Sequence, residues 1–343
     1  MEIANEGVTV RWTYPLNRWR LPRAVNTLPL LMYLLTQASR RNVRLTYIRF
    51  SPLTPLLVWI ARRLIPHSAI ITEHNGWVAS EASMGGWPAW LCTIVAHLQQ
   101  LDSRLADATR AVTYDVMKCL IEAGVSKDKV FVAENGTDLS RFYPIDRIQA
   151  KIDSGLDPSH LHIGFLGTIT PWQGVDVLLR AAAMLVKRYP NLRIVVGGSG
   201  GNIKAQQALA QDLNLSDVVI FLGWVPSAKA NMVINSFDIA VAPYHLPPDR
   251  PIGSPVKLRD YAAAGRPVVA ADYPVITHAS DESWCLLHRP GDHVQLAARL
   301  EELLADSDRR EAMGAHARSH AERNFSWNAV IDTITSRIPN IKR

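Results

Sequence analysis

The chain alternates between short runs of apolar residues and longer stretches in which apolar residues return every three or four positions. Short apolar runs are typical of strands buried on both faces of a sheet, and the longer repeat is typical of amphipathic helices. We expect strands at residues 7–13, 43–50, 69–72, 111–113, 130–133, 161–167, 192–196, 218–222, 238–242 and 268–271. We expect helices at residues 54–64, 89–105, 115–123, 175–186, 203–213, 228–236, 255–264, 293–304 and 327–338.

This order of elements predicts the fold class. Strands that alternate with helices form parallel sheets with both faces covered. We therefore expect an α/β protein with two Rossmann-like, doubly wound domains that face each other across a cleft. The polar stretch 145–160 is interpreted as an interdomain linker, which gives domains at 1–148 and 149–325. The last helix, in the segment 326–343, is expected to pack back on the first domain.

Composition narrows the class of protein without naming a function. The chain has 343 residues, 48% of them hydrophobic, and a mean hydropathy of +0.00, which is typical of a globular protein with two cores. Cys92, Cys119 and Cys285 show neither disulfide nor metal-ligand spacing, so a reducing cytoplasm is the expected location. The longest apolar runs, 28–35 and 52–60, are well short of the roughly 20 residues that cross a bilayer.

The charge balance is mildly basic, with a net charge of +6 and a pI of about 9.3. Such a balance fits an anionic ligand or an anionic membrane surface, but it lacks the dense basic clusters of a nucleic-acid-binding protein. Arg18, Arg20 and Arg23 lie next to Trp19, ahead of a Leu-rich segment. This N-terminal segment can rest on an anionic membrane. The alternative is a surface loop that leads into an ordinary core helix.

The stretch 251–272 carries the first candidate chemistry. Ser254 suits the N-cap of a helix and Pro255 its first position, while Gly265 suits a left-handed helix end. The N–H groups of Val256 and Lys257 would then face the loop mouth, where a helix N-terminus favours an anion. A cation in the first turn, at Lys257, destabilises a helix unless an anionic ligand offsets it. A solvated surface lysine is the alternative.

Three strand ends supply further candidates. Glu73, His74, Asn75 and Gly76 follow the strand 69–72, at the sheet edge where ligands bind in open α/β folds. His74 is a candidate general base or substrate hydrogen-bonding group, and a histidine satisfied by the backbone is the alternative. The glycine-rich run 197–201 can let the backbone approach a phosphate. The Asn-Gly pair at 135–136 predicts a tight turn with a positive φ.

Several segments, taken in order, resemble one known family. They are AENGTDLSRFYP, GTITPWQGVDVLLRA, FLGWVPSAKANMVINSFDIAVAPY, SPVKLRDYAAAGRPVVA and FSWNAVIDTI. This set resembles the retaining glycosyltransferases of the GT4 group, which are glycogen-synthase-like glycosyl transferases of group 1 with a GT-B fold. The resemblance covers nearly the whole chain. It implies a nucleotide-diphosphate-sugar donor held by the second domain, an acceptor held by the first, and no cofactor or metal.

The resemblance also implies roles for single residues. Ser254 and Lys257 match the segment that meets the donor diphosphate, and Asp260 stands where the family has a Glu that holds the ribose. Gly167 and Thr168 match the loop under the phosphates, and the segment 224–226 lies near the base. The candidate catalytic residues are His74, Lys257 and Asp260. The candidate donor-binding residues are Gly167, Thr168, Gln173, Gly198, Trp224, Val225, Pro226, Arg250, Ser254, Pro255, Val256, Lys257 and Asp260, and the candidate acceptor-side residues are Glu73, His74, Asn75 and Gly76.

The sequence departs from the family pattern at several positions. Thr168 stands in place of the usual Arg and Gln173 in place of the usual Lys, which leaves Lys257, with Arg250 or Arg259, as diphosphate cations. An acidic residue is often found where this chain has Ile252, and the nearby Asp249 is a candidate substitute. The family opens with a strand and a glycine-rich loop, whereas this chain starts at the next strand, so we expect the first strand to be missing.

The leading hypothesis is retaining transfer of a sugar to a glycan or lipid-linked acceptor, in the synthesis of a cell-envelope polysaccharide. The enzyme would be cytoplasmic, with peripheral contact to the inner face of the membrane through its basic N-terminal segment. Because cations are missing, a non-catalytic sugar-nucleotide binder or a partner subunit of an active transferase is the alternative. A sugar-nucleotide epimerase or hydrolase on the same fold is a third possibility.

Overall fold

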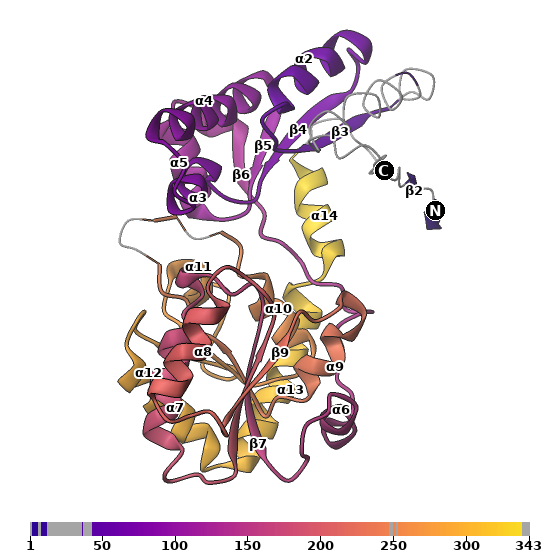
Figure 1. The fold of residues 1–343 in the computed structure, drawn as a ribbon. Helices are drawn as coiled ribbons and strands as arrows, with labels where there is room; N and C mark the ends of the chain where they lie inside the picture. The colour runs from indigo at the N-terminus through magenta and orange to yellow at the C-terminus, as the bar shows by residue number, and fades with distance from the viewer. Residues whose placement is uncertain are drawn as a thin grey trace. The chain divides into compact units, whose positions relative to one another are not determined.

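The computed structural model describes residues 36, 43–246, 250–251 and 253–337, and the backbone alone at 2–5 and 8–11. The chain forms two compact units, residues 1–133 with 334–343 and residues 134–333 (Figure 1). The unit boundary thus falls between Ala133 and Glu134, earlier in the chain than the expected division after residue 148. The prediction of an α/β chain built on parallel sheets is confirmed. Among the described residues, no helix is both long and apolar enough to cross a membrane.

The first unit contains a parallel sheet with strand order β3-β4-β5-β6. The register places Glu73 of β4 beside Arg49 of β3 and Arg110 of β5. The strands are β3 (Leu45–Arg49), β4 (Ala69–His74), β5 (Ala108–Ala111) and β6 (Val130–Val132). The helices are α2 (Thr54–Leu64), α3 (Val78–Met84), α4 (Ala89–Leu105) and α5 (Tyr114–Glu122), with a 3-10 turn η2 (Lys127–Lys129). These helices alternate with the strands as expected.

A separate two-stranded sheet lies at the start of the chain. β1 (Glu2–Asn5) and β2 (Val8–Arg11) pair in antiparallel fashion. The strand expected at 7–13 is therefore present as β2, but it pairs with β1 and not with the parallel sheet. The basic N-terminal segment around Trp19 lies outside the described residues.

The second unit contains a six-stranded parallel sheet with strand order β12-β11-β10-β7-β8-β9. The order reverses beside β7, as in a doubly wound fold. Its strands are β7 (Leu161–Leu166), β8 (Leu192–Gly197), β9 (Val219–Gly223), β10 (Ile239–Ala242), β11 (Val268–Ala271) and β12 (Cys285–His288). Its helices are α6 (Arg147–Asp153), α7 (Val175–Leu185), α8 (Ile203–Asp212), α9 (Ala230–Asn235), α10 (Val256–Ala263), α11 (Pro274–Thr277), α12 (His293–Leu304), α13 (Ser307–Asn324) and α14 (Trp327–Ser336), with 3-10 turns η3 (Pro171–Gln173) and η4 (Ser227–Lys229).

Two hydrophobic cores cover the two faces of this sheet. Successive residues of β8 alternate between them, because Ile194 and Val196 face the core under α7 and α12, whereas Val195 faces the core under α9 and α10. The helix α12 begins as expected, with the Asp292 carboxylate accepting a hydrogen bond from the Gln295 backbone N–H at 2.9 Å. Burial on both faces explains why the strand sequences are continuously apolar.

The expected linker at 145–160 is wrong, because it contains the helix α6. The Asp146 carboxylate caps this helix by accepting a hydrogen bond from the Gln149 N–H at 2.7 Å. Ile148 and Ile152 are exposed, while Ala150 and Lys151 are buried. A helix that buries a lysine and exposes its isoleucines has no apolar stripe on its inner face, so its sequence gives no amphipathic signal.

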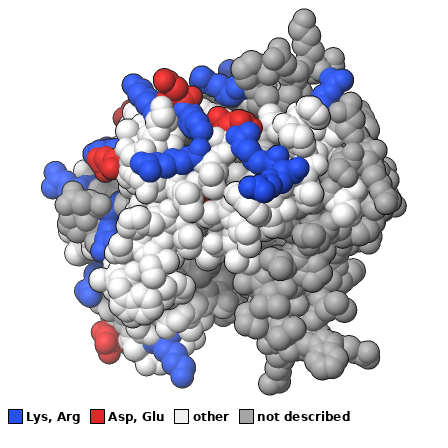
Figure 2. Space-filling view, turned by 90° about the horizontal axis from the view of Figure 1, so that it is seen from above, with Lys and Arg blue, Asp and Glu red and all other residues white. Residues whose placement is uncertain are grey.

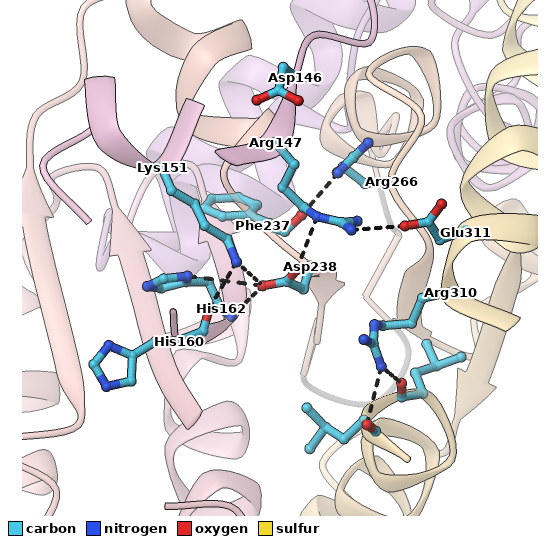
Figure 3. A network of polar contacts seen from close by, with 12 residues as sticks. Asp146, Arg147, Lys151, His160, His162, Phe237, Asp238, Arg266, Arg310 and Glu311 are labelled. Carbon is cyan, nitrogen blue, oxygen red and sulfur yellow. Dashed lines mark hydrogen bonds and ion pairs between the residues drawn. The ribbon is translucent and has the colours of Figure 1, made fainter. Parts of the chain in front are cut away.

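A buried carboxylate, Asp238, holds α6 against the sheet (Figure 3). It precedes β10, and one of its oxygens, Oδ2, accepts from the Lys151 Nζ at 2.8 Å and from the His162 backbone N–H at 2.7 Å. Its other oxygen, Oδ1, lies 3.2 Å from the Arg147 Nε, and Arg147 also contacts Glu311 of α13 at 3.0 Å. These ion pairs fix residues 146–151 to the second unit and explain why the boundary precedes them.

Candidate functional site

The second unit carries a pocket of about 620 Å³ at the carboxyl ends of its strands. In doubly wound folds this edge of the sheet binds ligands. The first turn of α10 and the loops that follow β6, β7 and β9 supply most of its wall. The lining residues are Gly136, Thr137, Asp138, Arg141, Phe142, Leu166, Gly167, Thr168, Gln173, Trp224, Val225, Ser227, Ala230, Ile234, Tyr244, Ser254, Val256, Lys257, Asp260, Tyr261 and Trp327.

Most of the predicted donor-binding residues lie together at this pocket. The predicted residues among its lining are Gly167, Thr168, Gln173, Trp224, Val225, Ser254, Val256, Lys257 and Asp260. Gly198, Pro226, Arg250 and Pro255 are described but do not line it. Asp249 and Ile252 lie outside the described residues.

Lys257 is the central cation of the pocket. Its Nζ lies 4.3 Å from the ring centroid of Phe165 and 4.6 Å from that of Tyr244, and it donates a hydrogen bond to the side-chain oxygen of Gln173. Among the described residues, no carboxylate lies within ion-pair distance of Lys257. Burial therefore lowers the pKa of Lys257 to about 7. A half-buried amine with aromatic and amide neighbours but no carboxylate partner is suited to an anionic ligand.

Gly167 lies close beside this lysine. A Cβ atom at Gly167 would lie 3.2 Å from both the Cε and the Nζ of Lys257. That distance is tighter than ordinary contact, so a larger residue would push the amine away from the loop. The glycine lets the backbone of the loop after β7 approach the amine closely.

The start of α10 differs from the prediction by one residue. The N-cap is Pro255 and not Ser254, and no side chain caps the helix. The Val256 N–H donates to the Ser254 carbonyl oxygen at 2.9 Å, so it is not free for an anion. The Ser254 hydroxyl instead accepts from Arg259 at 3.1 Å. At the other end, Gly265 has a φ of +67°, as predicted.

Arg259 is not a second cation of the pocket. Its side chain is buried and donates to the carboxylate of Glu134 and to the hydroxyl of Ser254. Its guanidinium also lies 5.2 Å from the ring centroid of Phe325. The guanidinium therefore has its own counter-ion and stabilises the segment that follows β6.

Asp260 lies on the same side of α10 as Lys257, one turn further along the helix. Its carboxylate accepts a hydrogen bond from the Thr137 hydroxyl at 2.7 Å. Burial raises the pKa of Asp260 to about 6, and the Thr137 hydrogen bond opposes that rise. Above that pH the carboxylate is ionised and can accept hydrogen bonds from a ligand hydroxyl.

The segment 134–138 runs beside the start of α14. Thr137 pairs with Ser326, and its N–H donates to the Phe325 carbonyl at 2.7 Å. The tight turn predicted at Asn135-Gly136 is wrong, since neither residue has a positive φ. Gly136 is needed for a different reason, because a Cβ there would lie 3.0 Å from atoms of Trp327.

The glycine-rich run after β8 lies behind the pocket wall. Gly198 has a φ of +132°, and a Cβ at this position would overlap the carbonyl oxygen of Gly167. Its backbone N–H donates to the Gly223 carbonyl at 2.7 Å. Gly198 therefore supports the loop after β7 and does not line the pocket.

Sequence reasoning missed several lining residues. Arg141 donates to the backbone oxygen of Ser227 at 2.5 Å and to its hydroxyl, which joins two segments of the wall. Thr137 holds Asp260, and Tyr244 lies under the lysine amine. Arg141 and Thr137 fall inside the quoted segment 133–144, so their inclusion in that segment was the available signal. Tyr244 had no signal beyond being the last residue of another segment.

The predicted acceptor-side histidine is buried inside the first unit. His74 is the last residue of β4 and is not in a loop, and its ring is stacked on Phe50 with centroids 5.1 Å apart. Its Nδ1 lies 3.0 Å from Gln99 and its Nε2 3.0 Å from the Ser103 hydroxyl. Both ring nitrogens are thus engaged by α4. Side chains rather than backbone satisfy the histidine, and its role as a general base or substrate hydrogen-bonding group stays a prediction.

The neighbours of His74 are also engaged within the first unit. The Glu73 carboxylate accepts from Arg110 at 2.6 Å and from the hydroxyl of Tyr47. Asn75 donates to the other oxygen of Glu73, and the Gly76 carbonyl accepts from Gln99 at 3.2 Å. These contacts follow from the strand register, which places Glu73 between two arginines.

Comparison with known proteins identifies the second unit. Residues 160–306 match the family model described as Glycosyl transferases group 1. The D-inositol 3-phosphate glycosyltransferase of Nocardia farcinica is 35% identical over 234 residues, covering 65% of this chain and 51% of the relative. The chain thus spans about half the length of that curated relative.

Solved structures of low sequence identity share the fold. Sucrose-phosphate synthase from Thermosynechococcus elongatus has a TM-score of 0.76 and 18% identity, covering 98% of this chain and 84% of that one. Anabaena Alr3699/HepE in complex with UDP and glucose has a TM-score of 0.72 and 19% identity, covering 90% of this chain and 80% of that one. Residues 160–306 thus match the glycosyl transferases of group 1, and the two-sheet α/β architecture of the chain is the GT-B fold.

Proposed function

We propose that the chain transfers a sugar from a nucleotide-diphosphate sugar, bound at the pocket of the second unit, with retention of configuration. The observation that carries the proposal is Lys257, a half-buried amine without a carboxylate partner among the described residues. It lies beside the glycine loop after β7 and at the start of α10. A donor diphosphate is an anion that would supply the missing counter-charge. The solved HepE complexes with UDP and with UDP-glucose, which share the fold, support this class of ligand.

Each part of a nucleotide sugar has a proposed partner in the pocket. The diphosphate would contact Lys257 and the loop at Gly167 and Thr168. The ribose would donate hydroxyl hydrogen bonds to Asp260, which Thr137 already orients. The base would lie against Trp224, whose side chain is 71% exposed and thus free to stack on a ring.

The transfer reaction requires the pocket to stabilise the leaving group. The bond between the anomeric carbon and the diphosphate oxygen breaks, and the acceptor hydroxyl forms the new bond and passes its proton to the leaving diphosphate oxygen. Negative charge then grows on the leaving diphosphate. A protonated Lys257 in a site of low dielectric stabilises that charge more in the transition state than in the ground state. The protein acts mainly through such electrostatic stabilisation, since no covalent nucleophile is part of the proposal.

The acceptor is proposed to be a glycan or a lipid-linked sugar of the cell envelope, bound by the first unit in the cytoplasm. The Nocardia farcinica relative is named for D-inositol 3-phosphate, so a phosphorylated polyol is the second acceptor class to test. Both classes present a hydroxyl nucleophile. They differ in the apolar surface that the acceptor site must offer.

The first experiment is a binding screen by thermal shift and calorimetry. UDP-, GDP-, ADP- and dTDP-glucose are the probes, and Lys257→Ala is the variant. A ligand that binds only the folded protein raises its melting temperature. We expect one nucleotide to give a shift that the variant loses. Absence of a shift with all four probes, or an equal shift in the variant, would refute the donor site.

Turnover separates catalysis from binding alone. Release of the nucleoside diphosphate is followed with acceptor extracts and with D-inositol 3-phosphate, and NMR of the product gives its anomeric configuration. Binding without turnover would favour the non-catalytic sugar-nucleotide binder. One observation favours that alternative: Gln173 and Thr168 supply no positive charge, and Gln173 accepts a hydrogen bond from the amine that would meet the diphosphate.

A further inference from the structure

The helix α4 of the first unit buries polar side chains and exposes apolar ones, which is the reverse of the usual arrangement. Its buried side chains include Gln99, Asp102 and Ser103, all at 0% exposure. Its outer face carries Trp90, which is 66% exposed, and Ile94. In a helix that packs on a sheet, the apolar side chains are expected to face inward. Here the polar side chains face inward because they contact His74, and the apolar side chains are left facing out.

The exposed apolar face extends beyond these two residues. Leu101 lies about two turns beyond Ile94 along α4, and Trp87 precedes the helix. The helix α2 packs against α4, and it exposes Leu56 and Trp59. Figure 1 shows α2 and α4 over the sheet of the first unit. We call this surface, formed by Leu56, Trp59, Trp87, Trp90, Ile94 and Leu101, the outer apolar face.

The exposed charge on α2 and α4 is positive, and the exposed carboxylate of Asp107, which follows α4, pairs with Arg62 at 2.5 Å. The segment Thr54–Leu64 of α2 has no acidic residue, and the only one in Ala89–Leu105 of α4 is the buried Asp102. Basic side chains lie at the C-terminal ends of the same helices, at Arg62, Arg63 and Arg104. The Arg63 guanidinium lies 4.4 Å from the ring centroid of Trp59. Figure 2 shows the molecule from above, with Lys and Arg side chains and some Asp and Glu side chains over white surface.

Two features of this surface select a lipid partner. Tryptophan side chains are enriched where a membrane meets water, and arginine stems lie along apolar surface while their heads reach anionic groups. A soluble partner with an apolar patch would not require the absence of carboxylates across both helices. An anionic headgroup layer does, because a carboxylate facing it is repelled.

We propose that the outer apolar face of α2 and α4 docks the first unit on an anionic lipid membrane. Trp59, Trp90 and Ile94 enter the boundary between headgroups and acyl chains, and Arg63 contacts lipid phosphates. The contact is interfacial, since neither helix is long enough to span the bilayer. This proposal does not rest on the glycosyl-transfer reaction, and it concerns residues other than the basic segment near Trp19.

The test is co-sedimentation of the full chain with vesicles of phosphatidylcholine, with and without the anionic lipid phosphatidylglycerol. The double variant Trp90→Ser with Ile94→Ser removes the apolar anchor, and Arg63→Gln removes one charge. Tyr143→Ser, which alters an aromatic residue 45% exposed on the second unit, is the matched control. Circular dichroism and thermal melting check that each variant is folded.

We expect binding to anionic vesicles that weakens as salt is raised. The double variant should lower binding by at least about tenfold, because two anchoring side chains are removed from the lipid. Arg63→Gln should lower it about threefold, and Tyr143→Ser should leave it unchanged. No binding by the parent protein, or equal binding by the double variant, would overturn the proposal.

Two further measurements keep the proposal testable if the double variant unfolds. Hydrogen exchange of the parent protein should show protection by vesicles in peptides that cover 54–64 and 87–105, and protection confined to other regions would overturn the assignment. Sedimentation velocity without lipid tests a second copy of the chain as the occupant. A dimer abolished by the double variant, with vesicle binding intact, would also refute the membrane contact.

Discussion

The protonation of Lys257 gives the sharpest prediction about the donor pocket. Burial lowers the pKa of this amine to about 7 in the unliganded protein, and no carboxylate among the described residues opposes that effect. A bound diphosphate would stabilise the ammonium form and raise its pKa. Donor binding should therefore take up protons, and affinity should fall as pH rises above 7.

The size of the effect follows from the linkage between binding and protonation. If the bound diphosphate restores the pKa of Lys257 to near 10.5, affinity falls by about 16-fold between pH 7 and pH 8.5. If the pKa is restored only to about 8.5, the same interval gives about eightfold. The 16-fold change corresponds to about 1.7 kcal/mol of binding free energy and the eightfold change to about 1.2 kcal/mol.

The assay is isothermal titration with the nucleotide sugar that the binding screen identifies. Titrations at pH 7, 7.5, 8 and 8.5 give the affinity, and two buffers with different ionisation enthalpies give the number of protons taken up. Working above pH 7 separates Lys257 from Asp260, whose pKa is about 6. Lys257→Arg is the matched variant, because a guanidinium stays charged over this range.

A specific pattern would refute the reasoning. If the parent protein binds equally well at pH 7 and pH 8.5, with no proton uptake, then Lys257 is not the group that meets the diphosphate or its pKa is not lowered. If Lys257→Arg keeps the full pH dependence, another group is responsible. Loss of the dependence in Lys257→Arg with retained binding is the expected result.

Three further predictions concern stability, each read from urea denaturation. Lys257→Met should raise the free energy of unfolding of the unliganded protein by about 1–3 kcal/mol at pH 6, because a lowered pKa makes the charged lysine unfavourable in the folded state at low pH. This gain should shrink as the pH rises from 7 toward 10.5. An unchanged or lowered stability would contradict the prediction. Gly198→Ala should lower the free energy of unfolding by more than about 2 kcal/mol, since the φ of Gly198 is +132° and a Cβ there would overlap Gly167. Gly201→Ala, which has open space around the added Cβ, should lower it by under about 1 kcal/mol. Asp238→Asn should lower the free energy of unfolding by about 3–5 kcal/mol, because Lys151 and Arg147 lose a buried counter-charge. Glu302→Gln, which breaks a more exposed ion pair, should lower it by under about 1 kcal/mol. Similar losses in the two variants would count against the Asp238 network.

Most regular elements were predictable because local signals and burial agree. The helices α2 and α4 have the predicted bounds, and the strand β11 is an unbroken apolar run between a left-handed glycine and a loop. The helix α6 and the boundary at Ala133 were not predictable, because both depend on ion pairs to Asp238, far away in the sequence. The helix α13 gave no clear pattern, since it buries mainly small residues such as Ala317 and Ala321.

The candidate site was predictable in its backbone frame but less so in its side-chain contacts. The position of Lys257 near the carboxyl ends of the strands follows from the order of elements. Its contacts with Gln173, Phe165 and Tyr244 do not, because they join residues from three separate segments. The contact with Gln173 gives a physical reason for that residue. An amide accepts a hydrogen bond from the free amine, whereas a lysine at the same place would repel it.

The histidine and the reversed helix share one cause. His74 ends β4 under α4, and an imidazole in a buried place needs hydrogen-bond partners. The helix supplies them from Gln99 and Ser103, so its polar stripe must face the sheet. The same rotation turns Trp90 and Ile94 outward, because the two stripes lie on opposite sides of one helix. An apolar periodicity in the sequence gives the width of a stripe but not its direction. The buried histidine sets the direction, and the exposed tryptophans are its consequence.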